Sequence, residues 1–214
     1  MSVRAVIFDF NGTLSHDEPI LCEIFRELFA EHGRPLSAQE YYEQLAGLSD
    51  EEIVRTWLGE NYPAVADVIE QRTARYRDRA ADGSTVPDAV REAVRYAAER
   101  VPVAAVSGAA RVEIEEVVCA AGLAGVISPI VAAEDAAEGK PHPAGYLRAL
   151  DLLDDGLPPS DAVAFEDTEA GVASAKAAGV RCLAVVGTLA PERLEAADEI
   201  VPAIDVDLMR RLLD

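Results

Sequence analysis

The chain has 214 residues, half of them hydrophobic, so it can bury the core of one domain with or without a modest inserted domain. Its 39 acidic and 19 basic residues give a formal net charge of −20, which repels a phosphate backbone and excludes nucleic acid as an expected partner. A small anionic substrate would need a local cation, such as a metal ion or a lysine, to approach such a protein.

The sequence shows no sign of export or of membrane contact. The first ten residues are too short and too soon acidic for a signal peptide, and no apolar run approaches the length of a membrane span. The three cysteines, Cys22, Cys119 and Cys182, form no CxxC pair and lie in apolar or helical stretches. We therefore expect a soluble cytoplasmic protein with reduced thiols and no membrane partner, and a monomer is the default expectation.

The first apolar run, residues 5–8, predicts a short strand, and a long helical region over residues 15–82 follows it. Apolar side chains recur at helical spacing from Ile20 to Phe29, and Gly33 is a plausible end for this helix.

Three more helices are predicted within the same region. Two of them begin at capping boxes, in which a serine is followed three residues later by a glutamate, and the third covers residues 64–79. The capping-box pairs are Ser37 with Glu40 and Ser49 with Glu52.

After residue 82 the pattern changes to apolar runs that alternate with segments of helical length. Continuous apolar strands separated by helices indicate a parallel sheet that is covered on both faces. We therefore predict an α/β fold in which residues 1–14 and 83–214 form a Rossmann-like core and residues 15–82 form an inserted helical domain. The later strands are expected at residues 103–106, 126–131, 162–165 and 182–186, and the helices at 112–121, 144–153 and 168–178.

Polar side chains follow several of these predicted strands. In open parallel sheets, ligands bind beyond the carboxyl ends of the strands, so residues that follow different strands can meet in one pocket. The first strand is followed by Asp9-Phe10-Asn11-Gly12-Thr13, the second by Ser107-Gly108 and the fourth by Glu166-Asp167, while Lys140 lies in a loop ahead of a helix.

Together these side chains suit the transfer of a phosphoryl group. Clustered carboxylates repel one another, and a hard cation such as Mg²⁺ relieves that repulsion by taking oxygen ligands. Lys140 can pair with phosphoryl oxygens and Ser107 can donate a hydrogen bond to them, which leaves Asp9 free to attack phosphorus and form an acyl phosphate. Taken singly, each residue is explained as well by a turn, a helix cap or a solvated loop, so the prediction depends on the ordered set.

The same residues resemble the four motifs of the haloacid dehalogenase superfamily. Asp9 to Leu14 resembles its first motif, which usually reads DxDGT in the phosphatases, and Ser107 after an apolar strand resembles the second. The GKPHP segment around Lys140 resembles the third motif, and Glu166-Asp167 before a helix resembles the fourth. The helical region is similar to the cap of the subfamily that holds phosphoglycolate phosphatases and β-phosphoglucomutases.

The resemblance implies a Mg²⁺-dependent phosphatase that acts on a small phosphorylated metabolite. It implies that Asp9 is the nucleophile and a metal ligand and that Asn11 offers its backbone carbonyl to the metal. It also implies that Asp167 is a metal ligand, and that Glu166 is either a ligand or a partner of one. The residues implied to hold or surround the phosphate are Ser107, Gly108, Lys140, Gly12, which permits a tight turn, and Thr13, which helps to fix that turn.

Asn11 departs from the resemblance, because the phosphatases usually carry an aspartate there as general acid and base. An amide keeps the shape of that group but cannot exchange a proton, and such catalysis contributes on the order of 10²–10⁴-fold. His16, close in the sequence, is a candidate substitute at the edge of the substrate site, although an exposed linker histidine is the favoured interpretation. Asp17 and Glu18 are weaker candidates.

Three other functions remain open at this stage. A phosphosugar mutase of the same fold is disfavoured, because the loop Gly47-Leu48-Ser49-Asp50 carries an acid where such mutases usually carry a basic residue. A regulatory protein that binds phosphate without turning it over is favoured by Asn11 alone. A carbon–halogen hydrolase is disfavoured by the complete set of predicted metal ligands.

Overall fold

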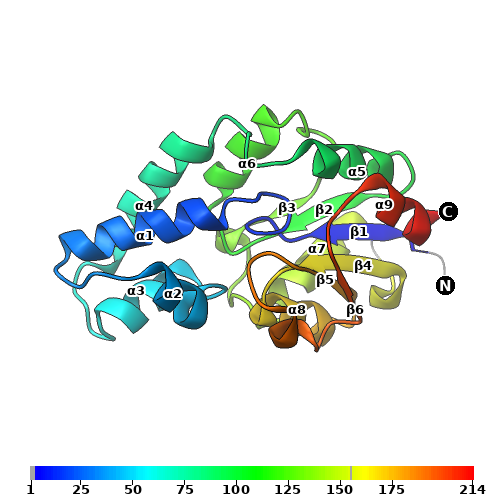
Figure 1. Cartoon of the computed structure of the whole chain (residues 1–214). Coiled ribbons are helices and arrows are strands. Elements are labelled where there is room, and N and C mark those ends of the chain that lie inside the picture. The colour runs from blue at the N-terminus through cyan, green and yellow to red at the C-terminus, as the bar shows by residue number, and fades with distance from the viewer. Residues whose placement is uncertain (1–2, 155) are drawn as a thin grey trace.

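The computed structural model describes residues 3–154 and 156–214, and within these its strands form a single parallel sheet (Figure 1). The order across the sheet is β3-β2-β1-β4-β5-β6, and each neighbouring pair is parallel. The strands are β1 (Ala5–Phe8), β2 (Val103–Val106), β3 (Ile130–Val131), β4 (Ala162–Glu166), β5 (Arg181–Val185) and β6 (Glu199–Val201).

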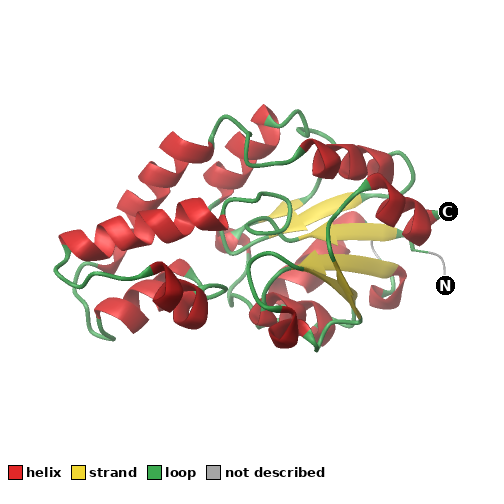
Figure 2. Cartoon of the chain, in the orientation of Figure 1, coloured by secondary structure: helices red, strands yellow, loops and turns green. Residues whose placement is uncertain are grey.

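Helices cover both faces of this sheet, and a further group extends beyond one end of it (Figure 2). Helices α5 and α9 pack together on one face, and α7 and α8 pack together on the other (Figure 1). The helices on the sheet are α5 (Asp88–Ala98), α6 (Arg111–Ala120), α7 (Ala144–Leu153), α8 (Glu169–Ala177) and α9 (Val206–Leu213). The arrangement confirms the predicted α/β fold with a parallel sheet.

The group beyond the sheet comes from the chain between β1 and α5, and it is helical as predicted. Its members are α1 (Glu18–Glu31), α2 (Ala38–Glu40), which continues as a π-helical turn over Tyr41–Leu45, α3 (Asp50–Leu58) and α4 (Val65–Ala80). Both predicted capping boxes are present, because each serine accepts from the backbone N–H of its glutamate while that glutamate accepts from the serine N–H. Helix α1 ends just before Gly33, whose φ of +74° suits glycine and stops the helix.

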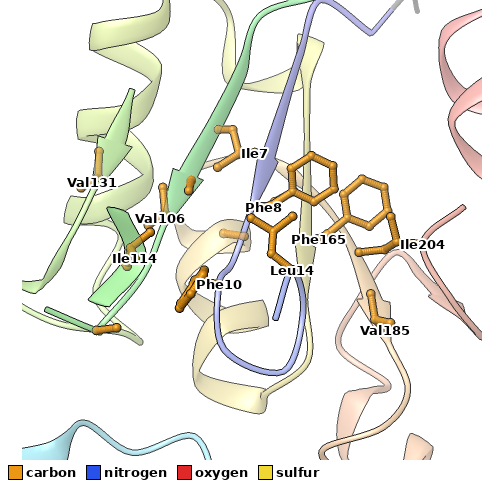
Figure 3. Packing of buried hydrophobic residues seen from close by; sticks show 14 of the residues in the cluster. Ile7, Phe8, Phe10, Leu14, Val106, Ile114, Val131, Phe165, Val185 and Ile204 are labelled. Atoms are coloured by element: carbon orange, nitrogen blue, oxygen red, sulfur yellow. The ribbon is translucent and has the colours of Figure 1, made fainter. Parts of the chain in front are cut away.

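The buried core explains why these segments become strands and helices. Strand β1 is fully buried and pairs with β2 and β4, so Val6 lies beside Val103 on one side and Val163 on the other. Phe8 of β1 and Phe165 of β4 are register partners, and their rings stack on one face of the sheet (Figure 3) with their centroids 5.1 Å apart. Strands without exposed faces need apolar side chains on both sides, which is why they appear in the sequence as unbroken apolar runs.

Some predicted boundaries differ from the structure. The run 126–131 forms a strand only at Ile130–Val131, because Pro129 has no backbone N–H with which to continue a ladder toward residue 126. Strand β6 and helices α5 and α9 were not predicted. Among the described residues, no helix combines the length and the apolar character needed to cross a membrane.

Candidate active site

The candidate site lies at the carboxyl edge of the sheet, where β1, β2 and β4 end side by side. Asp9 directly follows β1, and its backbone N–H donates to the carbonyl of Phe165 at 2.9 Å. Ser107 follows β2, and Glu166 and Asp167 stand at the end of β4. The register of the parallel strands therefore brings the predicted residues to one edge, as expected from the sequence.

Lys140 contacts the ends of all three of these strands. Its ammonium forms an ion pair with Asp9, lies 2.6 Å from Oε1 of Glu166 and donates to the carbonyl of Val106 at 3.1 Å. Burial lowers the pKa of Lys140, but the charges of Asp9 and Glu166 outweigh burial and raise its pKa overall. The lysine is therefore held in its charged form beside Asp9.

Three buried carboxylates form a candidate metal site. One oxygen from each of Asp9, Glu166 and Asp167 lies within 4.8 Å of the others. Burial raises the pKa of Glu166 to about 7, and burial together with the charges of Asp9 and Glu166 raises the pKa of Asp167. Oε2 of Glu166 and Oδ2 of Asp167 are buried and have no hydrogen-bond partner among the described residues. Oxygen ligands of this kind, crowded and only partly satisfied, fit a hard divalent cation such as Mg²⁺.

Two glycines leave room for these carboxylates. A Cβ on Gly12 would stand 1.9 Å from Oδ2 of Asp167, and a Cβ on Gly171 would stand 1.8 Å from Oε2 of Glu166. Gly12 also has a φ of +76°, which L-residues rarely adopt. Thr13 supports the same group, since its hydroxyl donates to Oδ1 of Asp167 at 3.2 Å. Gly12 and Thr13 thus shape the acid cluster, as the tight turn after β1 implied.

Asn11 is held by a buried carboxylate that lies six residues further on. Its side-chain amide donates to Oδ2 of Asp17 at 3.0 Å, and Asp17 also accepts from the N–H of Gly12 at 3.3 Å and from the hydroxyl of Tyr76. Asp17 is fully buried, and burial raises its pKa despite these donors. An amide at position 11 can donate to this carboxylate, whereas a second carboxylate there would repel it.

A cavity of about 110 Å³ opens onto the acid cluster and extends toward the helices beyond the sheet. On the sheet side it is lined by Asp9, Asn11, Ser107, Gly108, Lys140 and Asp167, so six of the predicted site residues meet there. On the helical side it is lined by residues from α1, the π-helical turn, α3 and α4, among them Glu18, Tyr41, Asp50 and Arg72.

The predicted residue His16 is placed differently. It is exposed, it does not line this cavity, and its backbone N–H donates to the carbonyl of Thr85 at 2.8 Å. Burial of part of the ring lowers its pKa. Asp17 and Glu18, which the sequence ranked below His16, are the acidic groups that lie against the site.

Arg72 and Tyr41 also line the cavity, and the sequence did not predict them as site residues. Arg72 lies on the buried stripe of α4, with Val65, Val68, Tyr76 and Ala80 at spacings of three and four residues. An arginine within an apolar stripe is a recognisable signal, because a buried arginine requires a partner. Tyr41 had no such signal, since a tyrosine on a core face is ordinary.

The burial of Glu18 predicts how the stability of the protein depends on pH. Its Oε1 accepts from the hydroxyl of Tyr41 at 2.8 Å, and burial, followed by the charges of Asp17 and Asp9, raises its pKa from 4.5 to about 7. Between pH 4.5 and about pH 7, Glu18 is protonated more often in the folded protein than in the unfolded chain. The free energy of unfolding therefore falls as the pH rises through this range. Above pH 7 the free energy of unfolding is lower by about 3 kcal/mol, since each tenfold change in proton affinity corresponds to about 1.4 kcal/mol.

We expect Glu18→Gln to remove this cost, because the amide oxygen can still accept from Tyr41. Urea unfolding at pH 8 should find the variant more stable than the wild type, and the difference should shrink toward pH 4.5. Glu23→Gln, at an exposed position of the same helix, is the matched control. Parallel pH profiles for the wild type and Glu18→Gln would contradict the assignment.

Known proteins resemble the chain over most of its length. It is 34% identical over 193 residues to the CbbY protein of Rhodobacter capsulatus, which covers 85% of this chain and 84% of the relative. It is 28% identical to validoxylamine A 7'-phosphate phosphatase of Streptomyces hygroscopicus subsp. limoneus over 92% of each chain. The crystal structure of a CbbY mutant from Rhodobacter sphaeroides with xylulose-(1,5)bisphosphate has a TM-score of 0.82 and 28% identity, covering 94% of this chain and 95% of that chain.

A sequence profile of the haloacid dehalogenase-like hydrolases matches residues 6–185, which include the three strand ends and the lysine loop that form the site. The match confirms the family that the motifs predicted. This chain is therefore a hydrolase that belongs to the haloacid dehalogenase-like family.

Proposed function

We propose that this protein is a Mg²⁺-dependent phosphatase that hydrolyses a small phosphorylated metabolite through an aspartyl phosphate on Asp9. The observation that carries the proposal is the position of the Asp9 carboxylate, which lies at the end of β1 between Lys140 and the carboxylates of Glu166 and Asp167. The phosphorylated compounds in the names of two relatives support the same substrate class.

In the first proposed step, one carboxylate oxygen of Asp9 attacks phosphorus, and the bond from phosphorus to the alcohol oxygen breaks. Lys140 contacts Oδ1 of Asp9, which leaves Oδ2 without that contact and available for the attack. Lys140, the Ser107 hydroxyl and nearby backbone N–H groups balance the charge on the phosphoryl oxygens. A Mg²⁺ ion held by Asp9, Glu166, Asp167 and the backbone carbonyl of Asn11 would supply further positive charge when bound.

In the second step, water attacks the phosphorus of the aspartyl phosphate, and inorganic phosphate and the Asp9 carboxylate are released. This step and the departure of the alcohol both need a proton to move, and the amide of Asn11 has none to exchange. We therefore propose that turnover is slow for esters with poor leaving groups, by a factor on the order of 10²–10⁴ relative to an acid at this position.

The test is a rapid-mixing time course with p-nitrophenyl phosphate and Mg²⁺ in which nitrophenolate and free phosphate are followed separately. This leaving group needs little protonation, so the first step can proceed without an acid at position 11. We expect a stoichiometric burst of nitrophenolate followed by slow release of phosphate, and no activity after Mg²⁺ is removed with a chelator. Equal, steady release of both products would show that another group supplies the base.

Asn11 also favours a second candidate, a protein that binds a phosphorylated ligand without hydrolysing it. The same time course separates the two functions, because such a protein releases neither product.

We also propose that residues 15–82 form a cap and that residues 1–14 and 83–214 form the core. The cap helices α1 and α4 pack against each other beyond the sheet (Figure 1). Helix α4 meets α6 of the core, where Arg77 forms an ion pair with Glu116. Hydrogen exchange that protected both parts equally, as one cooperative unit, would contradict this division.

A further inference from the structure

The helical side of the cavity presents a distinct set of polar groups, here called the distal wall, which consists of Glu18, Tyr41, Asp50 and Arg72. Each of the four comes from a different cap segment, and together they face the carboxylates and Lys140 across the cavity. The proposed reaction on phosphorus uses none of them. A substrate whose phosphate lies at Asp9 would extend its remaining atoms toward the distal wall.

Arg72 is the only cation of the distal wall, and its charge is already balanced. Its guanidinium forms a buried ion pair with Glu113 of α6, and its Nε lies 3.4 Å from Oδ1 of Asp50. Glu18 adds a further acidic group to the same wall. A second phosphate placed here would meet at least as much negative as positive charge, in a buried environment where repulsion is weakly screened.

The hydrogen-bonding groups of the distal wall suit a hydroxyl. Arg72 is 3% exposed, and its Nε is buried 3.4 Å from Oδ1 of Asp50 without a hydrogen bond to any residue in the described part of the chain, so Arg72 offers no open donor there. The carboxylates of Asp50 and Glu18 line the cavity and can accept from a ligand O–H. A hydroxyl both accepts and donates, whereas an ionised phosphate only accepts.

From these observations we propose that the distal wall recognises hydroxyl groups, so that the substrate is a monophosphate of a neutral, polyhydroxylated compound and carries no second phosphate. The proposal rests on the proposed function for the position of the phosphate, and it adds the class of compound that bears it.

The test measures binding without turnover. Calorimetry on the Asp9→Asn protein with Mg²⁺ gives Kd for three ligands with the same six-carbon chain: D-glucitol 6-phosphate, n-hexyl phosphate and D-glucitol 1,6-bisphosphate. We expect glucitol 6-phosphate to bind at least about tenfold more tightly than either of the others, because a site that hydrogen-bonds hydroxyls rejects analogues that lack them. Equal binding of hexyl phosphate, tighter binding of the bisphosphate, or no binding of any ligand would overturn the proposal.

A second variant tests the role assigned to Asp50. Adding Asp50→Asn removes one of the charges that balance Arg72, so the preference for monophosphate over bisphosphate should fall by about tenfold. Asp67→Asn makes the same charge change at an exposed position of α4 and should leave the preference unchanged. An unchanged preference in Asp50→Asn would contradict the proposal even if the wild-type order is as expected.

These measurements remain separate from the test of hydrolysis. Failure of p-nitrophenyl phosphate turnover in the wild type would count against the proposed function, whereas the order of the three Kd values reports on the distal wall alone.

Discussion

Asp9→Asn is expected to abolish the nitrophenolate burst and to lower kcat by roughly 10⁴-fold or more, the scale on which loss of a catalytic nucleophile acts in other hydrolases. The amide that replaces the carboxylate is a poor nucleophile and cannot form the acyl phosphate. Rapid mixing with p-nitrophenyl phosphate measures both the burst and the steady rate.

The fold should survive this substitution. Lys140 keeps its ion pair with Glu166 at 2.6 Å, and the buried cluster loses one of its mutually repelling charges. We therefore expect the thermal midpoint to be unchanged or raised, which separates loss of chemistry from loss of structure. Asp88→Asn, at a position where the side chain is 93% exposed, is the control for a lost acidic charge. A burst of wild-type size in Asp9→Asn would remove Asp9 from the proposed mechanism.

Exchanging the two side chains of the Asn11–Asp17 pair is expected to raise the steady release of phosphate by on the order of 10²–10⁴-fold, the contribution of a general acid and base. In the Asn11→Asp, Asp17→Asn double variant, a carboxyl group stands at the position next to the nucleophile. The amide at position 17 can still donate to it across the 3.0 Å contact. The measurement is the phosphate phase of the same time course.

The single variant Asn11→Asp provides the control for this exchange. In Asn11→Asp alone, the new carboxylate lies against the buried Asp17, and two such groups in contact share one proton instead of both ionising. We therefore expect a smaller gain in rate and a lower thermal midpoint at pH 8 than in the double variant. If the double variant releases phosphate no faster than the wild type, Asn11 does not limit turnover.

The contact between Asn11 and Asp17 could not be predicted from the sequence. The sequence identified Asn11 as the residue that departs from the phosphatase motif, and the family match supports the motif around it. It did not show that a buried carboxylate accepts from this amide, because the loop that returns position 17 to position 11 is decided by the turn at Gly12 and by the docking of α1. Nothing in the spacing distinguishes Asp17 from an exposed helix-cap aspartate.

The acid cluster was more predictable for a geometric reason. Parallel strands that pair in register end at the same edge of a sheet, so residues that follow such strands meet whatever the length of chain between them. Asp9 and Asp167 are far apart in the sequence, yet the pairing of β1 with β4 brings them together. Local apolar runs were enough to locate both strand ends.

No comparable rule predicts which residues form the distal wall. Arg72 and Glu113 are 41 residues apart on helices of different parts of the chain, and their ion pair exists only because α4 packs against α6. The sequence by itself determined the parallel sheet, the helical insertion, the family and the residues at the strand ends, because apolar periodicity and capping are local properties. Only the tertiary structure decided which side chains of the helices between β1 and α5 line the cavity, because packing between helices depends on contacts that no local pattern encodes.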